Sequence, residues 1–175
     1  SEAEKIEREV DKVVEDHRRL VRADLERVER VVEEHRRLVK EDLDRVDEVV
    51  KRLRKLKEDG TPKEEIRRLI EEVERRSRES LKEIKRTTDE VRKESKKSAD
   101  RLRETTERAK KRLDEANVRE DVLRRVRELL KTVHEEVKKV IKTSDDILRT
   151  VHDEVRKVIK TSEKILREVA EEVER

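Results

Sequence analysis

The chain has 175 residues, of which 57% are charged and 30% hydrophobic, and it contains no Phe, Trp, Tyr, Met or Cys. The lack of cysteine excludes disulfides, thiol chemistry and cysteine-ligated zinc sites. No apolar run approaches the roughly 20 residues of a membrane-spanning helix, and no signal-peptide core is found, so we expect a soluble, untargeted chain whose localisation stays open. The 51 basic and 48 acidic residues leave a net charge of only +3.

A first helix is predicted over residues 2–59. Ser1 and Glu4 have the spacing of a capping box at its start. Valines and leucines recur on one side of the helical wheel from Val10 to Leu53, which indicates a core-facing stripe. Four polar residues stand at the centre of this stripe, where an ordinary bundle would have leucine: His17, Asp24, His35 and Asp42.

The only glycine and the only proline both lie in KEDGTPKEE, which predicts one sharp turn. Gly60 fits the left-handed position after a helix end, Thr61 fits an N-cap, and Pro62 fits the first helical position. A second helix is therefore predicted over residues 62–116. Its inward side carries Ile, Leu and Val interleaved with eight hydroxyl residues: Ser77, Ser80, Thr87, Thr88, Ser95, Ser98, Thr105 and Thr106.

A weaker boundary lies in DEANVRED, where Asn117 can end one helix or cap the next. It predicts a third helix over residues 118–174. The apolar stripe of this helix spans a particularly wide arc between Val122 and Val173. Ser144 and Ser162 lie at the centre of the stripe, and two histidines lie at its margin: His134 and His152.

Two very short loops require consecutive helices to run antiparallel. We therefore predict an all-α fold, a long, straight, up-down-up three-helix bundle that forms a single domain over residues 1–175. The segment 16–33 recurs as 34–51, and 133–150 recurs as 151–168. Because 18 residues make five turns at 3.6 residues per turn, this repeat predicts helices without a left-handed supercoil.

Folding the chain at its two turns brings polar residues of different helices to the same height. On α-helical geometry, His134 lies within about a turn of the height of His17, and His152 lies equally near the height of His35. A buried polar group without a partner costs on the order of 1–3 kcal/mol, so we predict stacked hydrogen-bond networks separated by apolar layers. The predicted layers are His17 with Thr105 and Thr106, His35 with Thr87 and Thr88, Asp24 with Ser95 and Ser98, and Asp42 with Ser77 and Ser80.

Idealised loops, near-identical 18-residue repeats, polar groups at core positions and a Glu/Lys/Arg surface resemble computationally designed helical bundles with buried hydrogen-bond networks. The resemblance covers the whole chain. Natural spectrin-like repeats are less similar, because this chain lacks their buried tryptophan and has longer helices. The resemblance implies a structural or binding role without catalysis, in a class that includes scaffolds, oligomers, heterodimers and pH-responsive assemblies.

Metal and catalytic motifs do not fit the histidines. The Glu-x-x-His motif is missing, because the residues three positions earlier are Val14, Val32, Lys131 and Arg149, and HExxH is missing as well. His17 and Asp24 are separated by roughly 10 Å along one helix, too far for a catalytic dyad. We therefore predict no enzyme, no metal site and no cofactor, although a site formed by His17 and His134 is conceivable.

A basic excess over residues 84–113 is interspersed with acids and has no aromatic residue for base stacking, which favours a solvated surface over a nucleic-acid site. A membrane surface is disfavoured because the apolar stripes carry no Trp or Phe anchor. Two functions stay open. One is a self-contained scaffold that needs no partner. The other is a helix-association module, either a homo-oligomer or the three-helix half of a heteromeric bundle.

The buried histidines add a prediction about pH. Burial in an apolar core disfavours the charged imidazolium and lowers the folded pKa, so the bundle should weaken below about pH 6.

Overall fold

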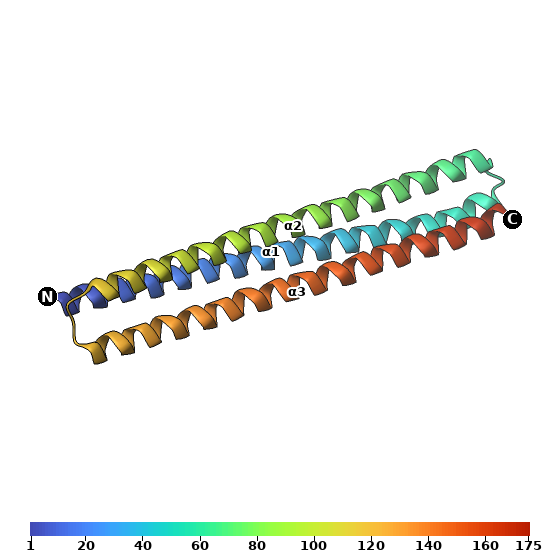
Figure 1. Cartoon of the computed structure of the whole chain (residues 1–175). Helices are drawn as coiled ribbons and strands as arrows, with labels where there is room; N and C mark the ends of the chain where they lie inside the picture. Colours follow the sequence, from blue (N-terminus) through green and yellow to red (C-terminus); the bar gives the residue numbers. More distant parts are fainter. The chain divides into compact units, whose positions relative to one another are not determined.

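The computed structural model describes residues 1–175 and contains three helices joined by two short connections (Figure 1). These are α1 (Glu2–Glu58), α2 (Lys63–Glu115) and α3 (Glu120–Glu174). The predicted all-α, three-helix fold is confirmed. None of the three helices combines the length and the hydropathy that a membrane-spanning helix requires.

Helix α1 has a capped start and a glycine-dependent end. The Ser1 hydroxyl accepts the amide N–H of Glu4 at 3.3 Å, as the sequence predicts. At the other end, Thr61 donates its N–H to the carbonyl of Leu56 at 3.0 Å, and Gly60 donates to Lys57 at 3.1 Å. This pair of bonds is a Schellman motif, and Gly60 supplies its left-handed residue with a φ of 74°.

The other two helices begin slightly later than expected. The carbonyl of Pro62 accepts the first bonds of α2, so Pro62 is the N-cap and Lys63 is the first helical residue. In the second loop the carbonyl of Arg119 accepts the first bonds of α3, from the N–H groups of Val122 and Leu123. Arg119 therefore takes the cap position that the sequence suggested for Asn117.

The chain forms two compact units, each of which contains a segment of every helix. Unit 1 comprises residues 1–29 and 90–147, and unit 2 comprises residues 30–89 and 148–175. Every polar layer predicted from the sequence lies inside one unit. Each unit holds one His/Thr layer and one Asp/Ser layer, because the 18-residue repeat supplies one copy of each. The interpretation of residues 1–175 as a single domain stays a prediction.

Within each unit the helices run up-down-up. In unit 1, α1 residues pair with α2 residues of falling number, since Glu9 contacts Arg112 and Asp24 contacts Ser95. Pairs between α1 and α3 rise together, from His17 beside His134 to Asp24 with Ser144. The corresponding pairs of unit 2 follow the same order. Helices α1 and α2 are therefore antiparallel, and α1 and α3 are parallel.

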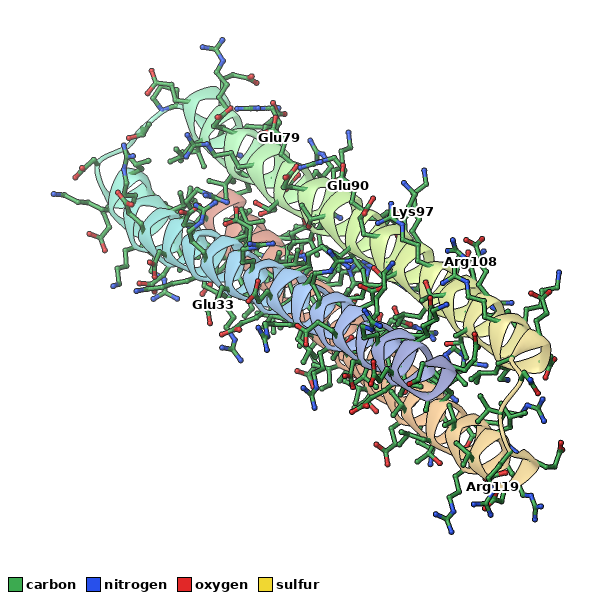
Figure 2. The ribbon with its side chains drawn as sticks, turned by 90° about the vertical axis from the view of Figure 1, so that its left-hand side faces the viewer. Glu33, Glu79, Glu90, Lys97, Arg108 and Arg119 are labelled. Atoms are coloured by element: carbon green, nitrogen blue, oxygen red, sulfur yellow. The ribbon has the colours of Figure 1, made fainter.

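The apolar stripes are buried in clusters, and charged side chains such as Glu33, Lys97 and Arg108 cover the outside (Figure 2). Valines, leucines and isoleucines of all three helices form the clusters, which removes their apolar surface from water and stabilises the fold by about 25 cal/mol per Å². The main cluster of unit 1 contains Ile6, Val13, Ala109, Leu113, Leu123 and Leu130. The largest cluster of unit 2 contains Val46, Val49, Leu53, Ile66, Ile70, Val73, Leu166, Val169 and Val173.

Candidate functional site: buried hydrogen-bond networks

The centre of unit 1 contains a buried carboxylate that joins all three helices. Asp24 of α1 is fully buried. One of its carboxylate oxygens accepts a hydrogen bond from Ser95 of α2, and the other accepts one from Ser144 of α3 at 2.8 Å. Hydrogen bonds to an ionised carboxylate are roughly twice as strong as neutral ones, so this layer is a strong connection between the helices.

Unit 2 contains the same arrangement. Asp42 is fully buried and accepts hydrogen bonds from Ser77 of α2 and from Ser162 of α3, the latter at 2.8 Å. Apolar residues lie on both sides of this layer. One cluster is built on Val46, and the other contains Ile84, Val155 and Ile159. The Asp/Ser layer of unit 2 therefore has the alternation with apolar layers that the sequence predicts.

Two arginines complete these layers and were not anticipated from the sequence. Arg27 lies 3.5 Å from the Asp24 carboxylate and donates to the Ser98 hydroxyl at 3.1 Å. Arg45 lies 3.6 Å from Asp42 and donates to Ser80 at 3.4 Å. Ser98 and Ser80 therefore contact an arginine, whereas the sequence placed them with the aspartates. Each arginine supplies a positive charge beside a carboxylate that is buried without access to water.

The His/Thr layer of unit 1 has three members, one from each helix. Thr106 of α2 lies between two imidazoles, 3.3 Å from Nε2 of His17 and 3.4 Å from Nδ1 of His134. The two rings are edge-to-face, with centroids 5.8 Å apart. Nδ1 of His17 donates to the backbone carbonyl of Val13 at 2.7 Å, because a carbonyl can only accept.

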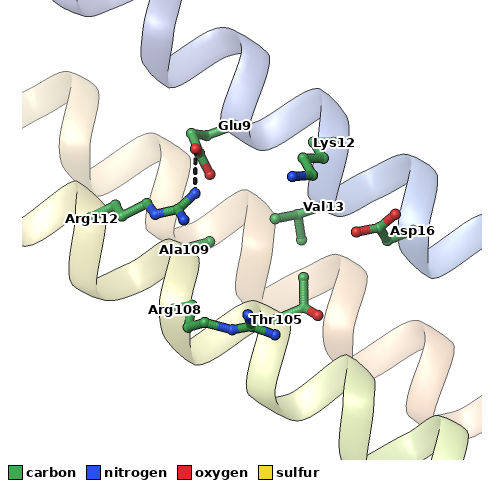
Figure 3. A pocket seen from close by; sticks show the side chains of 8 residues that line it. All are labelled: Glu9, Lys12, Val13, Asp16, Thr105, Arg108, Ala109 and Arg112. Carbon is green, nitrogen blue, oxygen red and sulfur yellow. Dashed lines mark hydrogen bonds and ion pairs between the residues drawn. The ribbon is translucent and has the colours of Figure 1, made fainter.

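Thr105 does not enter this layer, although the sequence placed it level with His17. It is half-buried and lines a shallow surface pocket between α1 and α2, together with Val13, Asp16 and Arg108 (Figure 3). Adjacent residues of a helix point about 100° apart, so only one of the two threonines can face both histidines. Thr106 takes that place.

The His/Thr layer of unit 2 is built differently. His35 contacts both threonines of α2 through Nε2, at 3.0 Å from Thr87 and 3.5 Å from Thr88. Thr88 also contacts Nδ1 of His152 at 3.2 Å. Nδ1 of His35 is buried without a hydrogen-bond partner, in contrast to Nδ1 of His17.

Burial governs the protonation of these histidines. The cost of desolvating a charged ring lowers the pKa of His17, His35 and His134 below the ordinary value of 6.5. The carbonyl of Val13 and the charge of Asp16 partly offset this for His17. The neighbouring imidazole of His152 lowers the pKa of His35 further. The folded protein therefore favours neutral imidazoles.

No group of three or more His, Cys, Asp or Glu side chains is placed to hold a metal ion. The hydroxyl of Thr88 donates to the carbonyl of Ile84 at 2.8 Å, and the hydroxyl of Thr106 lies 2.8 Å from the carbonyl of Leu102. Nδ1 of His35 and Nε of Arg27 and of Arg45 are buried without a hydrogen-bond partner. Each layer joins its helices by hydrogen bonds between side chains.

No family model matches this sequence, and no curated protein matches it. Among solved structures, the chain is similar to a computationally designed three-helix bundle at 15% sequence identity, with a TM-score of 0.46. The alignment covers 97% of this chain and 84% of that chain. Of the features on which the resemblance to designed helical bundles rests, the short connections and the buried His/Thr and Asp/Ser networks are present in the structure.

Proposed function

We propose that this chain is a non-catalytic scaffold, a designed helical bundle in which buried networks select one alignment of the helices. The observation that carries the proposal is the pairing of Asp24 with Ser95 and Ser144, which takes one residue from each helix. Unit 2 repeats it with Asp42. A shift of one helix by a turn would bury the carboxylate against apolar side chains, at a cost of several kcal/mol.

The absence of catalysis belongs to this proposal. The chemically active side chains of the core, imidazoles and carboxylates, are occupied by threonine, serine and arginine neighbours inside the bundle. Their role is to form hydrogen bonds with side chains of the other helices that lie at the same position along the bundle axis. Because polar groups find partners in only one alignment, while apolar layers tolerate several, the networks supply specificity and the apolar clusters supply most of the stability.

Cysteine cross-linking tests this function, since the chain contains no cysteine of its own. Glu9→Cys with Arg112→Cys reports the observed alignment, because the two side chains form an ion pair (Figure 3). Asp16→Cys with Arg112→Cys reports an alignment displaced by seven residues. In the chain with its networks intact, a short bifunctional maleimide should link only the cysteines at positions 9 and 112.

The decisive comparison uses a variant without the Asp/Ser networks. It carries Leu at Asp24 and Asp42, Met at Arg27 and Arg45, and Ala at Ser77, Ser80, Ser95, Ser98, Ser144 and Ser162. Apolar replacement of a complete buried polar network is often neutral or stabilising, so this variant should fold. We expect it to give both cross-links. If it gives only the Glu9–Arg112 product, the Asp/Ser networks do not set the alignment and the role proposed for them is wrong.

A further inference from the structure

The 18-residue repeat of α2 is broken at one apolar position. Ser98 of unit 1 corresponds to Ser80 of unit 2, so the next residue, Ala99, corresponds to Leu81. The two side chains differ by an isopropyl group. Because the polar layers on which this correspondence rests occur in both units, unit 2 serves as an internal reference for the surroundings of Ala99.

In unit 2 the leucine lies beside a buried cluster formed by α2 and α3. Leu81 packs against this cluster, which consists of Ile84, Val155 and Ile159. Val155 is 8% exposed, and Ile159 is fully buried. The side chain of Leu81 therefore fills the space next to these residues.

In unit 1 the corresponding place is a cavity of about 40 Å³. Its apolar lining consists of Ala99, Leu102, Val137 and Ile141. Val137 is half-buried, whereas the equivalent Val155 is buried. Ile141 is 7% exposed, whereas the equivalent Ile159 is fully buried. A single water needs roughly 10–15 Å³, so the cavity has room for a larger group.

The surroundings of this cavity are positively charged. Arg103 of α2 and Lys138 of α3 line it, and both are exposed. The segments 92–103 and 131–142, which hold the lining residues, contain ten basic and four acidic side chains. Arg103 is paired with Asp100 at 2.7 Å. Lys138 forms no ion pair, although Glu135 lies three residues before it, so Lys138 is the cation available to an anionic group.

We propose that this cavity binds a short branched-chain carboxylate. The aliphatic end of the ligand occupies the space that Leu81 fills in unit 2, and the carboxylate pairs with Lys138. The matching ligand is 3-methylbutanoate, in which a leucine side chain is joined directly to a carboxylate. Apolar pockets with a few placed polar groups are the usual form of small-molecule sites. A ligand this small buries little surface, so we expect a dissociation constant on the order of millimolar.

His134 also lines the cavity and reports on its occupation. NMR titration with sodium 3-methylbutanoate at constant pH should move the imidazole Cε1–H signal of His134 along a saturating curve. The signals of His35 and His152 in unit 2 should stay in place. Sodium acetate is the control, because it has the carboxylate without the branched chain and should bind at least about tenfold more weakly.

Ala99→Leu gives unit 1 the side chain that unit 2 carries at this position. The variant should fold, because unit 2 accommodates the leucine, and its denaturation midpoint should rise as the cavity is filled. The saturating shift of His134 should disappear. Binding and folding are thus measured separately in one variant.

Leu81→Ala is the reciprocal variant, which opens the equivalent place in unit 2. Lys85 and Arg156 stand there at the positions of Arg103 and Lys138, and both are exposed. The variant should therefore gain a second site. Its occupation should move the signal of His152, which the ligand leaves unchanged in the parent chain.

The position of the carboxylate is tested by Lys138→Gln. Removal of an exposed ion pair should raise the dissociation constant of 3-methylbutanoate about two- to fivefold. The neutral analogue 3-methylbutan-1-ol should bind the parent chain and this variant equally. Equal binding of the acid by both chains would overturn the ion pair with Lys138.

The proposal is wrong if the signal of His134 shows no saturating shift, or if the shift survives in Ala99→Leu. An affinity for acetate equal to that for 3-methylbutanoate would also contradict it, because the cavity would then play no part. An unmoved His152 signal in folded Leu81→Ala would show that loss of the leucine side chain does not create the site. None of these results bears on the alignment role of the buried networks.

Discussion

Two histidines that the sequence repeat makes equivalent have different surroundings. Nδ1 of His17 donates to the Val13 carbonyl, and its Nε2 faces Thr106, whose hydroxyl can turn toward the Leu102 carbonyl. A protonated His17 would therefore keep a partner for both N–H groups. A protonated His35 would bury an N–H at Nδ1 without an acceptor, which costs on the order of 1–3 kcal/mol.

We therefore predict that the pKa of His17 lies above the pKa of His35, although burial holds both below 6.5. NMR titration of the imidazole Cε1–H signals measures both values in one sample. Thr106→Val removes the acceptor for Nε2 of His17, so it should lower that pKa and leave His35 unchanged. Equal pKa values, or a higher value for His35, would contradict the prediction.

The height of each polar residue could be predicted from the sequence, but its direction could not. Counting residues from the turns places Thr105 and Thr106 at nearly one height, and the choice between them depends on how α2 is rotated against α1. Arg27 and Arg45 could not be predicted as members of the networks for another reason. Arg27 resembles any surface arginine in sequence, and only the packing shows that its side chain is largely buried and reaches Ser98 and Asp24.

At the scale of single elements, the boundary between α1 and α2 depends on one backbone conformation. Gly60 has a φ of 74°, and a Cβ there would meet no atom within 4 Å. Gly60→Ala should therefore cost only the strain of a left-handed alanine, about 1 kcal/mol. Chemical denaturation measures this loss as a lower midpoint.

Gly60→Asn is the matched control, because asparagine tolerates the left-handed region and should cost less than alanine. An unchanged midpoint for Gly60→Ala would mean that the loop can end α1 without the Schellman motif.

The helix caps show which helix boundaries could be predicted from local sequence. Ser1 caps α1 as expected, whereas Pro62 and Arg119 take cap positions that the sequence assigned to Thr61 and Asn117. The existence of each turn follows from strong local preferences for glycine and proline. The residue at which the next helix starts depends on how the following segment packs, which the local pattern does not contain.

At the scale of the whole molecule, the histidine pKa values determine how stability depends on pH. The folded pKa values of His17, His35 and His134 lie below 6.5, so the unfolded chain binds protons first as the pH falls. These groups leave the free energy of unfolding unchanged above about pH 6.5. The free energy then decreases as the pH falls through the folded pKa values. Nearby Asp16 and Glu34 reduce the loss, and Lys110 and Lys138 add to it.

Urea denaturation at a series of pH values between 7.5 and 5 checks this prediction. Replacement of all four histidines with Asn should flatten the decrease on the acid side, because asparagine cannot bind the proton. If the decrease survives in that variant, carboxylates are its source and the histidines act only as polar packing residues.

The repeated construction of the two units has a consequence for length. A block of 18 residues makes five whole turns, so its insertion or removal leaves the angular phase of every later residue unchanged. Matched blocks added to α1, α2 and α3 at one height would add a further His/Thr and Asp/Ser pair of layers without altering the loops. Eighteen residues are thus the step by which all three helices can be lengthened or shortened together while the same side chains face the core.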